Sequence, residues 1–278
     1  MTVAEFTLLV FLGSVAAGFL GSLTGLGGGV VIVPLLVLAF GIDLHYAVGA
    51  SLVSVIATSS GAAAAYVRQG LPNIRVGMLL EIATTLGAIG GAFLAAIVAP
   101  SAISIVFGIV LLISAAFSGR PRPDPSDTGA PDPLATRLRL DGVQPAPNGP
   151  EPYRVRRVPL GFLLMAMAGI LSGLLGIGSG AFKVLALDRA MRLPFKVATT
   201  TSNFMIGVTA AASAGIYLTR GFIDPGVSMP VMLGVLAGAA LGARVLTAAR
   251  VPVLRVVFTI IIVVLAVEMI YKGFTGRL

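Results

Sequence analysis

The chain has 278 residues, of which 57% are hydrophobic and 11% are charged. Soluble domains carry roughly a quarter charged residues, and a chain of this length cannot bury so much apolar surface in water, so the composition indicates an integral membrane protein. The net charge is +8, but the basic residues lie between apolar segments, which favours loops beside a membrane over a nucleic-acid partner. With no cysteine and one histidine, thiol catalysis and a His or Cys metal cluster are excluded, and we expect no cofactor.

Ten apolar segments follow one another along the chain, five on either side of a polar stretch. In the first half they cover residues 3–23, 26–40, 47–67, 76–99 and 102–117. In the second half they cover residues 160–175, 181–191, 197–218, 227–249 and 251–271. A transmembrane helix needs about 20 residues, so the second segment of each half is too short for a regular span. The sequence predicts an all-α polytopic membrane protein with four to five transmembrane helices in each half.

The two halves are related by an internal repeat with a constant offset of 151 positions. Gly25-Leu26-Gly27-Gly28-Gly29 matches Gly176-Ile177-Gly178-Ser179-Gly180, and the match continues without a gap over about ninety positions. A fixed offset held over such a length indicates a duplicated unit. We therefore expect a first transmembrane repeat over residues 1–118, a linker over 119–157 and a second transmembrane repeat over 158–278.

The linker differs in composition from both repeats. Residues 119–153 hold nine of the 17 prolines, together with arginine, aspartate and few large apolar residues. Such a composition cannot form a packed core, so it predicts a disordered segment. Its arginines place the linker in the cytoplasm.

The topology depends on whether the short segments cross the membrane. If they do not, the repeats are parallel and both termini are cytoplasmic; if they do, the repeats are inverted and both termini face outward. With the linker inside, inversion places six basic residues inside and three outside, whereas parallel repeats exchange the two sets. Because cytoplasmic loops carry the excess of basic residues, the charges favour inverted repeats. The two sets are Arg189, Arg192, Lys196, Arg244, Arg250 and Arg255 against Arg220, Lys272 and Arg277.

The glycine clusters are the first candidate for a substrate site. Since glycine has no side chain, the backbone can leave the helix there and bring N–H groups close to a ligand. The helices that follow direct their positive ends to the same place, which suits an anion. Close helix packing of the Gly-xxx-Gly type is the alternative. The candidate residues are Gly25, Gly27, Gly28 and Gly29 in the first half and Gly176, Gly178, Ser179 and Gly180 in the second.

Polar side chains near the start of the third segment form a second candidate. Thr200, Thr201, Ser202 and Asn203 offer donors to an anion or ligands to a cation, whereas the matching first-half positions keep only Ser51. The alternative is that the hydroxyls bond back to carbonyls of their own helix.

Two charged residues lie within apolar segments. Lys183 stands three positions after Gly180, where the first half has Ile32, and a lysine at membrane depth is a functional candidate. Its alternative is an interfacial anchor that extends toward the membrane surface. Glu81 could carry a coupling proton, but we favour an ion pair with Arg68 or Arg75.

The single histidine lies in a short polar segment beside Asp43. We interpret His45 as a surface residue.

These residues carry a resemblance to a known family. Gly25–Gly29 followed by Pro34 and by Ala50-Ser51-Leu52 resembles the first-half signature of the TauE/SafE sulfite exporters, also called 4-toluene sulfonate uptake permeases. Gly176–Gly180 with Phe182-Lys183-Val184, and the stretch from Lys196 to Gly207, resembles the second-half signature more closely. Ser179 departs from the usual glycine and Leu185 from a frequent proline, and both soften the predicted helix break. The resemblance covers nearly the whole chain apart from the linker, and it implies transport of anions such as sulfite, sulfoacetate or other sulfonates.

Together these features predict a secondary transporter in the cytoplasmic (inner) membrane, with one anion site between the halves near the midplane and alternating access. Because no nucleotide-binding motif is present, a coupling proton or other ion, or the substrate's own gradient, must drive it. A passive anion channel shares most of these features. An intramembrane enzyme or scaffold is disfavoured, since no catalytic pair lies at membrane depth. The expected partners are a small anion and the lipid bilayer; the oligomeric state, the anion and the direction of transport are left open.

Overall fold

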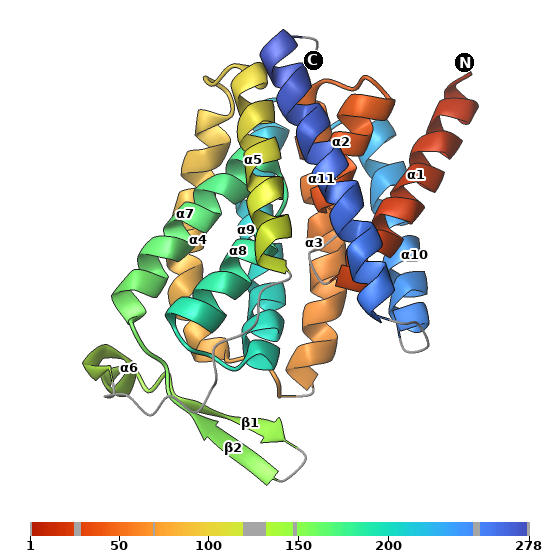
Figure 1. Cartoon of the computed structure of the whole chain (residues 1–278). Coiled ribbons are helices and arrows are strands. Elements are labelled where there is room, and N and C mark those ends of the chain that lie inside the picture. The colour runs from red at the N-terminus through yellow and green to blue at the C-terminus, as the bar shows by residue number, and fades with distance from the viewer. Residues whose placement is uncertain are drawn as a thin grey trace.

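The structure is a computed structural model that describes residues 2–24, 29–68, 70–118, 132–146, 149–246 and 251–276. The first half contains α1 (Val3–Thr24), α2 (Gly29–Ala39), α3 (Leu44–Arg68), α4 (Ile74–Leu94) and α5 (Pro100–Ser118). The second half contains α7 (Val158–Leu175), α8 (Gly180–Leu185), a π-helical turn (Ala186–Ala190), α9 (Phe195–Thr219), α10 (Pro225–Leu246) and α11 (Val251–Thr275). Between them lie α6 (Pro133–Arg137) and an antiparallel hairpin of β1 (Gly142–Ala146) and β2 (Gly149–Tyr153) (Figure 1). The predicted all-α class is confirmed.

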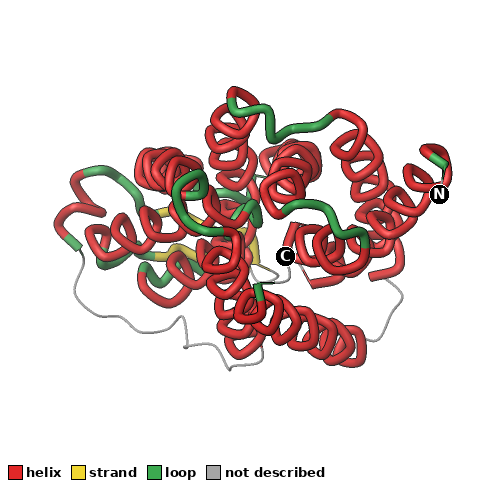
Figure 2. The backbone as a smooth tube through the Cα atoms, turned by 90° about the horizontal axis from the view of Figure 1, so that it is seen from above, coloured by secondary structure: helices red, strands yellow, loops and turns green. Residues whose placement is uncertain are grey.

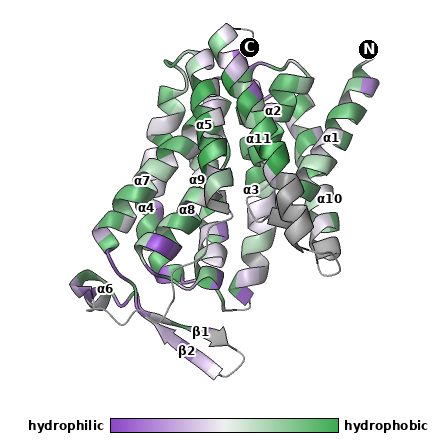
Figure 3. Cartoon of the chain, viewed as in Figure 1, coloured by the Kyte–Doolittle hydropathy of each residue, from purple (hydrophilic) through white to green (hydrophobic). Residues whose placement is uncertain are grey.

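The helices pack side by side in one bundle (Figure 2), and many large hydrophobic side chains are exposed on its outer surface. Leu86, Leu163 and Val267 are 65%, 59% and 55% exposed, and hydrophobic residues line the bundle while the end with α6 and β2 is more hydrophilic (Figure 3). Such a surface would be unfavourable in water, so it faces lipid. Within the described residues, five helices are long and apolar enough to cross a membrane: Val3–Gly21, Leu44–Arg68, Ile74–Leu94, Val158–Leu175 and Pro225–Gly242.

The second helix of each half is short, as the sequence predicts. Helix α2 has 11 residues and α8 has six, which at the helical rise gives about 17 Å and 9 Å, against a hydrocarbon core of about 30 Å. Helix α8 continues directly into the π-helical turn, in keeping with the leucine at position 185. The short helices therefore reach only part of the way across the bundle.

The chain ends and the segment between the halves lie at opposite ends of the bundle. Figure 1 shows both termini at one end and the β-hairpin at the other, with α2 toward the termini and α8 toward the hairpin. An odd number of passes along the bundle in each half produces this arrangement, and it is the one that inverted repeats would require.

The contacts between the halves are exchanged in the same way. A Cβ placed on Gly18 of α1 would lie 2.7 Å from the Cα of Val235 on α10, and one placed on Gly169 of α7 would lie 2.9 Å from the Cα of Thr84 on α4. Gly18 and Gly169 are separated by 151 positions, and so are Thr84 and Val235. Each half thus lays its first helix against the fourth helix of the other, at glycines that let the backbones touch.

The segment between the halves is more ordered than its composition predicts. Residues 119–131 and 147–148 lie outside the described residues, but 132–157 carry α6 and the hairpin, which corrects the expected disorder there. Asn73 holds the hairpin to α4: its Nδ2 donates to the Leu140 carbonyl at 2.7 Å and to the Tyr153 hydroxyl at 2.9 Å. Leu140 and Val155 are buried among residues of the bundle. Composition alone missed these few contacts because they come from single residues in a proline-rich background.

Asp132 begins this ordered part. Its carboxylate accepts hydrogen bonds from the backbone N–H groups of Leu134 and Val158, each at 2.9 Å. Burial acts to raise the pKa of Asp132, but the backbone donors outweigh burial and hold it below its usual value. One side chain thereby caps α6 and fixes the start of α7.

His45 is not a surface residue, which corrects the sequence interpretation. Its side chain is 14% exposed, its Nε2 lies 2.9 Å from the Ala95 carbonyl oxygen, and its ring stacks on Phe222 with 4.8 Å between centroids. Since Phe222 follows α9, His45 forms part of the contact between the halves near the terminal end.

Asn73 provides a stability test. We expect Asn73→Ala to lower the melting temperature followed by circular dichroism, because it removes the N-terminal cap of α4, in which Asn73 Oδ1 accepts from the Val76 N–H at 3.1 Å, and both bonds to the hairpin. The cost is about 1 kcal/mol for the cap and about 1 kcal/mol for each lost hydrogen bond. Asn203→Ala is the matched control, since the Asn203 amide makes no hydrogen bond within the part of the chain that the structure describes. Equal melting temperatures for the two variants would contradict the account.

The topology can be tested with single cysteines, because the chain has none of its own. We expect Thr2→Cys and Thr275→Cys to react in intact cells with a maleimide that cannot cross the membrane, and Glu151→Cys to react only after permeabilisation. All three positions are exposed. Labelling of Glu151→Cys in intact cells, with the termini protected, would reverse the orientation; labelling of only one terminus would exclude the inverted arrangement.

Candidate functional site

The second glycine cluster forms a tight non-helical turn inside the bundle. Gly176, Gly178 and Ser179 have φ values of 68°, 65° and 45°, all in the left-handed region. Helix α7 ends where the Gly176 N–H bonds to the Ser172 carbonyl at 2.9 Å, and α8 begins at Gly180. Ser179 holds the left-handed conformation despite its Cβ, and its hydroxyl is buried without a partner among the described residues.

The first cluster is described only at its last residue. Gly25, Gly27 and Gly28 lie outside the described residues, whereas Gly29 is buried and begins α2. The two glycine clusters can therefore be compared in the structure only at Gly29 and its equivalent, Gly180.

Serine hydroxyls tie both short helices to the long third helices. The Ser51 Oγ of α3 lies 2.8 Å from the Gly176 carbonyl oxygen and 3.4 Å from that of Gly29, and the Ser202 Oγ of α9 lies 3.3 Å from the Gly180 carbonyl oxygen. The Ser51–Gly29 and Ser202–Gly180 pairs are equivalent under the 151-residue offset. The Ser51–Gly176 bond crosses between the halves, so the broken segment of one half directly meets the third helix of the other.

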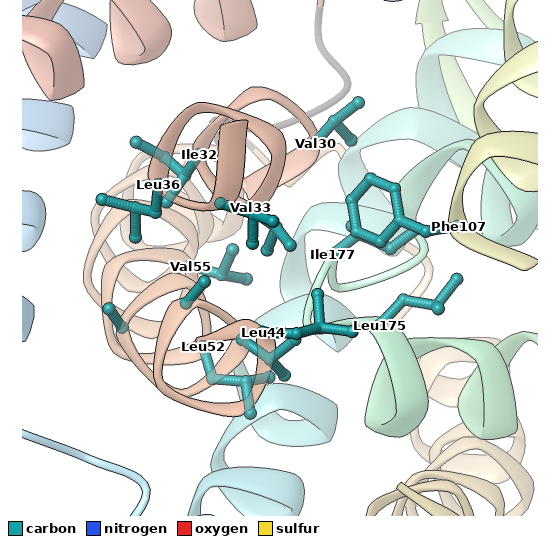
Figure 4. Close-up of a cluster of buried hydrophobic side chains, with 14 of the residues drawn as sticks. Val30, Ile32, Val33, Leu36, Leu44, Leu52, Val55, Phe107, Leu175 and Ile177 are labelled. Atoms are coloured by element: carbon teal, nitrogen blue, oxygen red, sulfur yellow. The ribbon is translucent and has the colours of Figure 1, made fainter. Parts of the chain in front are cut away.

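Apolar side chains pack around this meeting point. A Cβ added to Gly178 would lie 2.9 Å from the Ile206 side chain and 3.0 Å from that of Val55. Figure 4 shows Val55 of α3 on the side toward α2, and Ile177 beside Phe107 of α5. The turn is thus held in a close-packed apolar setting, where backbone polar groups depend on internal partners.

Lys183 is buried in the protein and does not reach the membrane surface. Its side chain is 0% exposed, and its Nζ donates to the Thr209 hydroxyl of α9 at 2.5 Å. That hydroxyl lies 2.7 Å from Glu81 Oε1 of α4, so the three side chains form a chain of hydrogen bonds across the two halves. The interfacial-anchor alternative for Lys183 is wrong.

Glu81 does not make the ion pair favoured from the sequence. Its Oε1 accepts from Thr209 and, at 3.1 Å, from Thr85, whereas Arg75 donates to the Arg139 carbonyl at 3.1 Å. Arg75 therefore has its partner in the segment between the halves, and the Glu81 carboxylate has its partners inside the bundle. Thr209 is the residue that sequence reasoning missed; the equivalent position in the first half is also a threonine, Thr58, so the sequence does not single Thr209 out.

The polar run of α9 divides into residues with different contacts. Thr200 bonds back to the Lys196 and Val197 carbonyls at 2.9 and 3.1 Å, as the structural alternative expects. Thr201 accepts from the Asn73 N–H at 2.9 Å and so joins the halves. Asn203 is partly buried. Ser202 is the member that contacts the glycine turn.

The apolar bundle, the short second helices and the buried polar chain define a polytopic membrane protein with a polar interior. The family profile described as "Sulfite exporter TauE/SafE" matches residues 10–269, and this chain belongs to that family.

Relatives in bacteria have the same general description. Probable membrane transporter protein YunE of Bacillus subtilis (strain 168) is 27% identical over 97% of this chain and 98% of its own length. Probable membrane transporter protein YdhB of the same organism is 28% identical over 85% of this chain and 87% of its own length. A probable membrane transporter protein of Xylella fastidiosa (strain 9a5c) is 26% identical over 97% of both chains. No solved structure matches the chain.

Gly178 offers a test of the turn. We expect Gly178→Ala to destabilise the protein, because the left-handed backbone costs an alanine about 1–2 kcal/mol and the methyl group would meet Ile206 and Val55. Gly215→Ala on α9 is the matched control: a Cβ there has nothing within 4 Å, and alanine is favoured over glycine in a helix by about 1 kcal/mol. Circular dichroism melts of purified protein compare the two. Equal melting temperatures would show that the turn does not need its observed conformation.

Proposed function

We propose that this membrane transporter is a secondary transporter that moves a small, sulfur-containing anion across the cytoplasmic membrane by alternating access. The family supports the substrate class, and sulfite, sulfoacetate and other sulfonates are the candidates. The observation that carries the proposal is the Ser51–Gly176 hydrogen bond, because it brings the broken segment of one half against the third helix of the other. Helices broken near the midplane of paired repeats are where secondary transporters bind substrate.

The repeats supply the movement. We infer that the halves are inverted copies, supported by the exchanged glycine contacts and by termini that lie opposite the hairpin (Figure 1). Two inverted copies of one unit can adopt two equivalent tilts, one open to each side of the membrane, if one half rocks against the other about a fixed site. The contacts at Gly18 and Gly169 are close backbone contacts of the kind by which small residues pack membrane helices together.

The anion would bind where the broken segments meet. Backbone N–H groups of the two clusters, the hydroxyls of the third helices and Lys183 are the proposed contacts, because they combine hydrogen-bond donors with a positive charge. The apolar side chains around them exclude water, which strengthens those contacts. The proposed residues are Gly25, Gly27, Gly28, Gly29, Ser51, Gly176, Gly178, Ser179, Gly180, Lys183, Thr200, Thr201, Ser202 and Asn203.

The function is tested by transport into liposomes that contain purified protein. We expect labelled sulfite or sulfoacetate to accumulate above its external concentration under an imposed ion gradient, whereas a passive channel would only equilibrate it. Lys183→Met removes a charge-assisted hydrogen bond worth about 1.5–3 kcal/mol, so the half-saturation concentration should rise roughly ten-fold to a hundred-fold.

Lys196→Met is the matched control, because Lys196 is exposed at the start of α9 and lies outside the proposed site. It should leave the half-saturation concentration unchanged. An unchanged value for Lys183→Met, measured on protein that elutes as a single folded species, would remove Lys183 from the anion site. Absence of accumulation for every anion tested would reject the proposed function.

A further inference from the structure

We propose that Glu81 is the binding site for a coupling proton and that one proton enters it with each transported anion, so that a monovalent anion crosses without net charge. This inference rests on the anion transport proposed above and adds the coupling ion and the stoichiometry. It starts from the hydrogen-bond chain that joins Lys183, Thr209 and Glu81.

The chain connects the two halves through buried groups. Lys183 Nζ donates to Thr209 Oγ1, and Thr209 Oγ1 lies 2.7 Å from Glu81 Oε1. Glu81 belongs to α4 of the first half, while the other two residues belong to α8 and α9 of the second. Lys183 lies one turn after the glycine-broken segment, and its N–H bonds to the Ser179 carbonyl at 3.0 Å. A change at Glu81 therefore reaches the proposed anion site through two contacts.

Thr209 has one hydroxyl proton and two acceptors for it. Besides Glu81 Oε1, the Met205 carbonyl oxygen of the same helix lies 2.9 Å from Thr209 Oγ1. The hydroxyl can donate to the carboxylate or turn to the carbonyl, and in both positions it still accepts from Lys183. This single group can thus take two arrangements at little cost.

Glu81 has a free oxygen for the proton. Thr85 and Thr209 both bond to Oε1, whereas Oε2 is buried and has no hydrogen-bond partner among the described residues. A proton can therefore be added at Oε2 without breaking either existing bond.

Lys183 is the charged group that acts on Glu81. Its ammonium reaches the carboxylate through the single hydroxyl of Thr209. Helix α7, which packs against α4, has no ionisable side chain within Val158–Leu175. Lys196 of α9 and Arg75 of α4 are exposed near the hairpin end, and Tyr217 of α9 is about two turns past Thr209 with its hydroxyl bonded to the Gly173 carbonyl.

The stoichiometry follows from charge balance at membrane depth. The resting pair of Lys183 ammonium and Glu81 carboxylate has no net charge, and an uncompensated charge in the membrane interior is costly. Entry of an anion adds one negative charge, which a proton on Glu81 cancels. Protonation converts the carboxylate to a carboxylic acid, lets the Thr209 hydroxyl turn to Met205, and leaves the ammonium of Lys183 to pair with the anion. On the far side the anion leaves, Glu81 returns its proton to water, and the pair re-forms.

The positions related by the 151-residue offset provide an internal control. The equivalents of Lys183 and Thr209 are Ile32 and Thr58 in the first half, and the equivalent of Glu81 is Met232 in the second half. Thr58 bonds back to the Ser54 carbonyl at 3.0 Å. The equivalent position in the fold therefore exists without a charged pair. Thr58 occupies the same place on its helix as Thr209 but has no charged side chain at the equivalent positions, which makes it a control for Thr209.

The wild-type protein in liposomes gives the first test. The probe is isethionate, a monovalent sulfonate that stays ionised at every working pH, so any proton that moves is carried by the protein. We expect each isethionate taken up to acidify the lumen by one proton, as reported by an internal pH dye, at a rate that a clamped membrane potential does not change. Sulfoacetate, which is divalent, should bring the same single proton and should enter faster when the lumen is positive.

Variants then assign the proton to its site. Glu81→Gln should keep measurable exchange of labelled isethionate between loaded liposomes and the medium but lose lumen acidification and gradient-driven accumulation. Thr209→Val should lower the proton-to-anion ratio below one, whereas Thr58→Val should leave it at the wild-type value. If Glu81→Gln fails to fold, the proton-to-anion ratio of the wild-type protein and the comparison of Thr209→Val with Thr58→Val still test the proton site.

The outcomes separate the two proposals. Wild-type protein that exchanges neither sulfonate would reject the proposed function itself. Exchange without proton movement, proton-coupled accumulation that persists in Glu81→Gln, or equal ratios in the two threonine variants would overturn the proton site while leaving anion transport intact.

Discussion

The structure depends on one constraint: inside a bilayer, each backbone polar group and each charge must find its partner within the protein. The helix break at Gly176 and the start of α2 at Gly29 satisfy this through the Ser51 hydroxyl, which lies within reach of both carbonyl oxygens. Lys183 satisfies it through Thr209 and Glu81. The Ser51–Gly176 and Thr209–Glu81 bonds run between the halves, so groups that membrane burial makes expensive are also groups that join the two halves.

The residues that match between the halves differ from the residues that carry charge. Glycines that match across the repeats, such as Gly18 and Gly169, make the exchanged backbone contacts and build the scaffold. The charged groups have no counterpart, since Ile32 stands where the second half has Lys183. In the proposed rocking mechanism, the positions that match at the 151-residue offset would form the surface on which the halves move, and the unmatched Lys183 and Glu81 would carry the charges. The binding chemistry could then change while that movement is kept.

Much of the fold could be predicted from the sequence, because apolar segment length and the 151-residue offset report directly on membrane helices and duplication. The short helices also follow from segment length. The partner of Glu81 could not be predicted, since the bond to Thr209 spans 128 positions and leaves no periodic signal. The order of residues 132–157 was missed for a related reason: Asn73, distant in sequence, supplies its hydrogen bonds. Thr200, a candidate ligand, makes the local bonds that its residue type equally allows.

The central claim is that Lys183 and Glu81 compensate each other's charge across the halves, and a double variant tests it most directly. Removing one member of a buried pair costs about 3–5 kcal/mol, because the other charge is left uncompensated. Lys183→Met and Glu81→Gln should therefore each lower the melting temperature measured by circular dichroism, and the combined variant should melt above Lys183→Met alone. Melting temperature losses that simply add in the double variant would contradict the account.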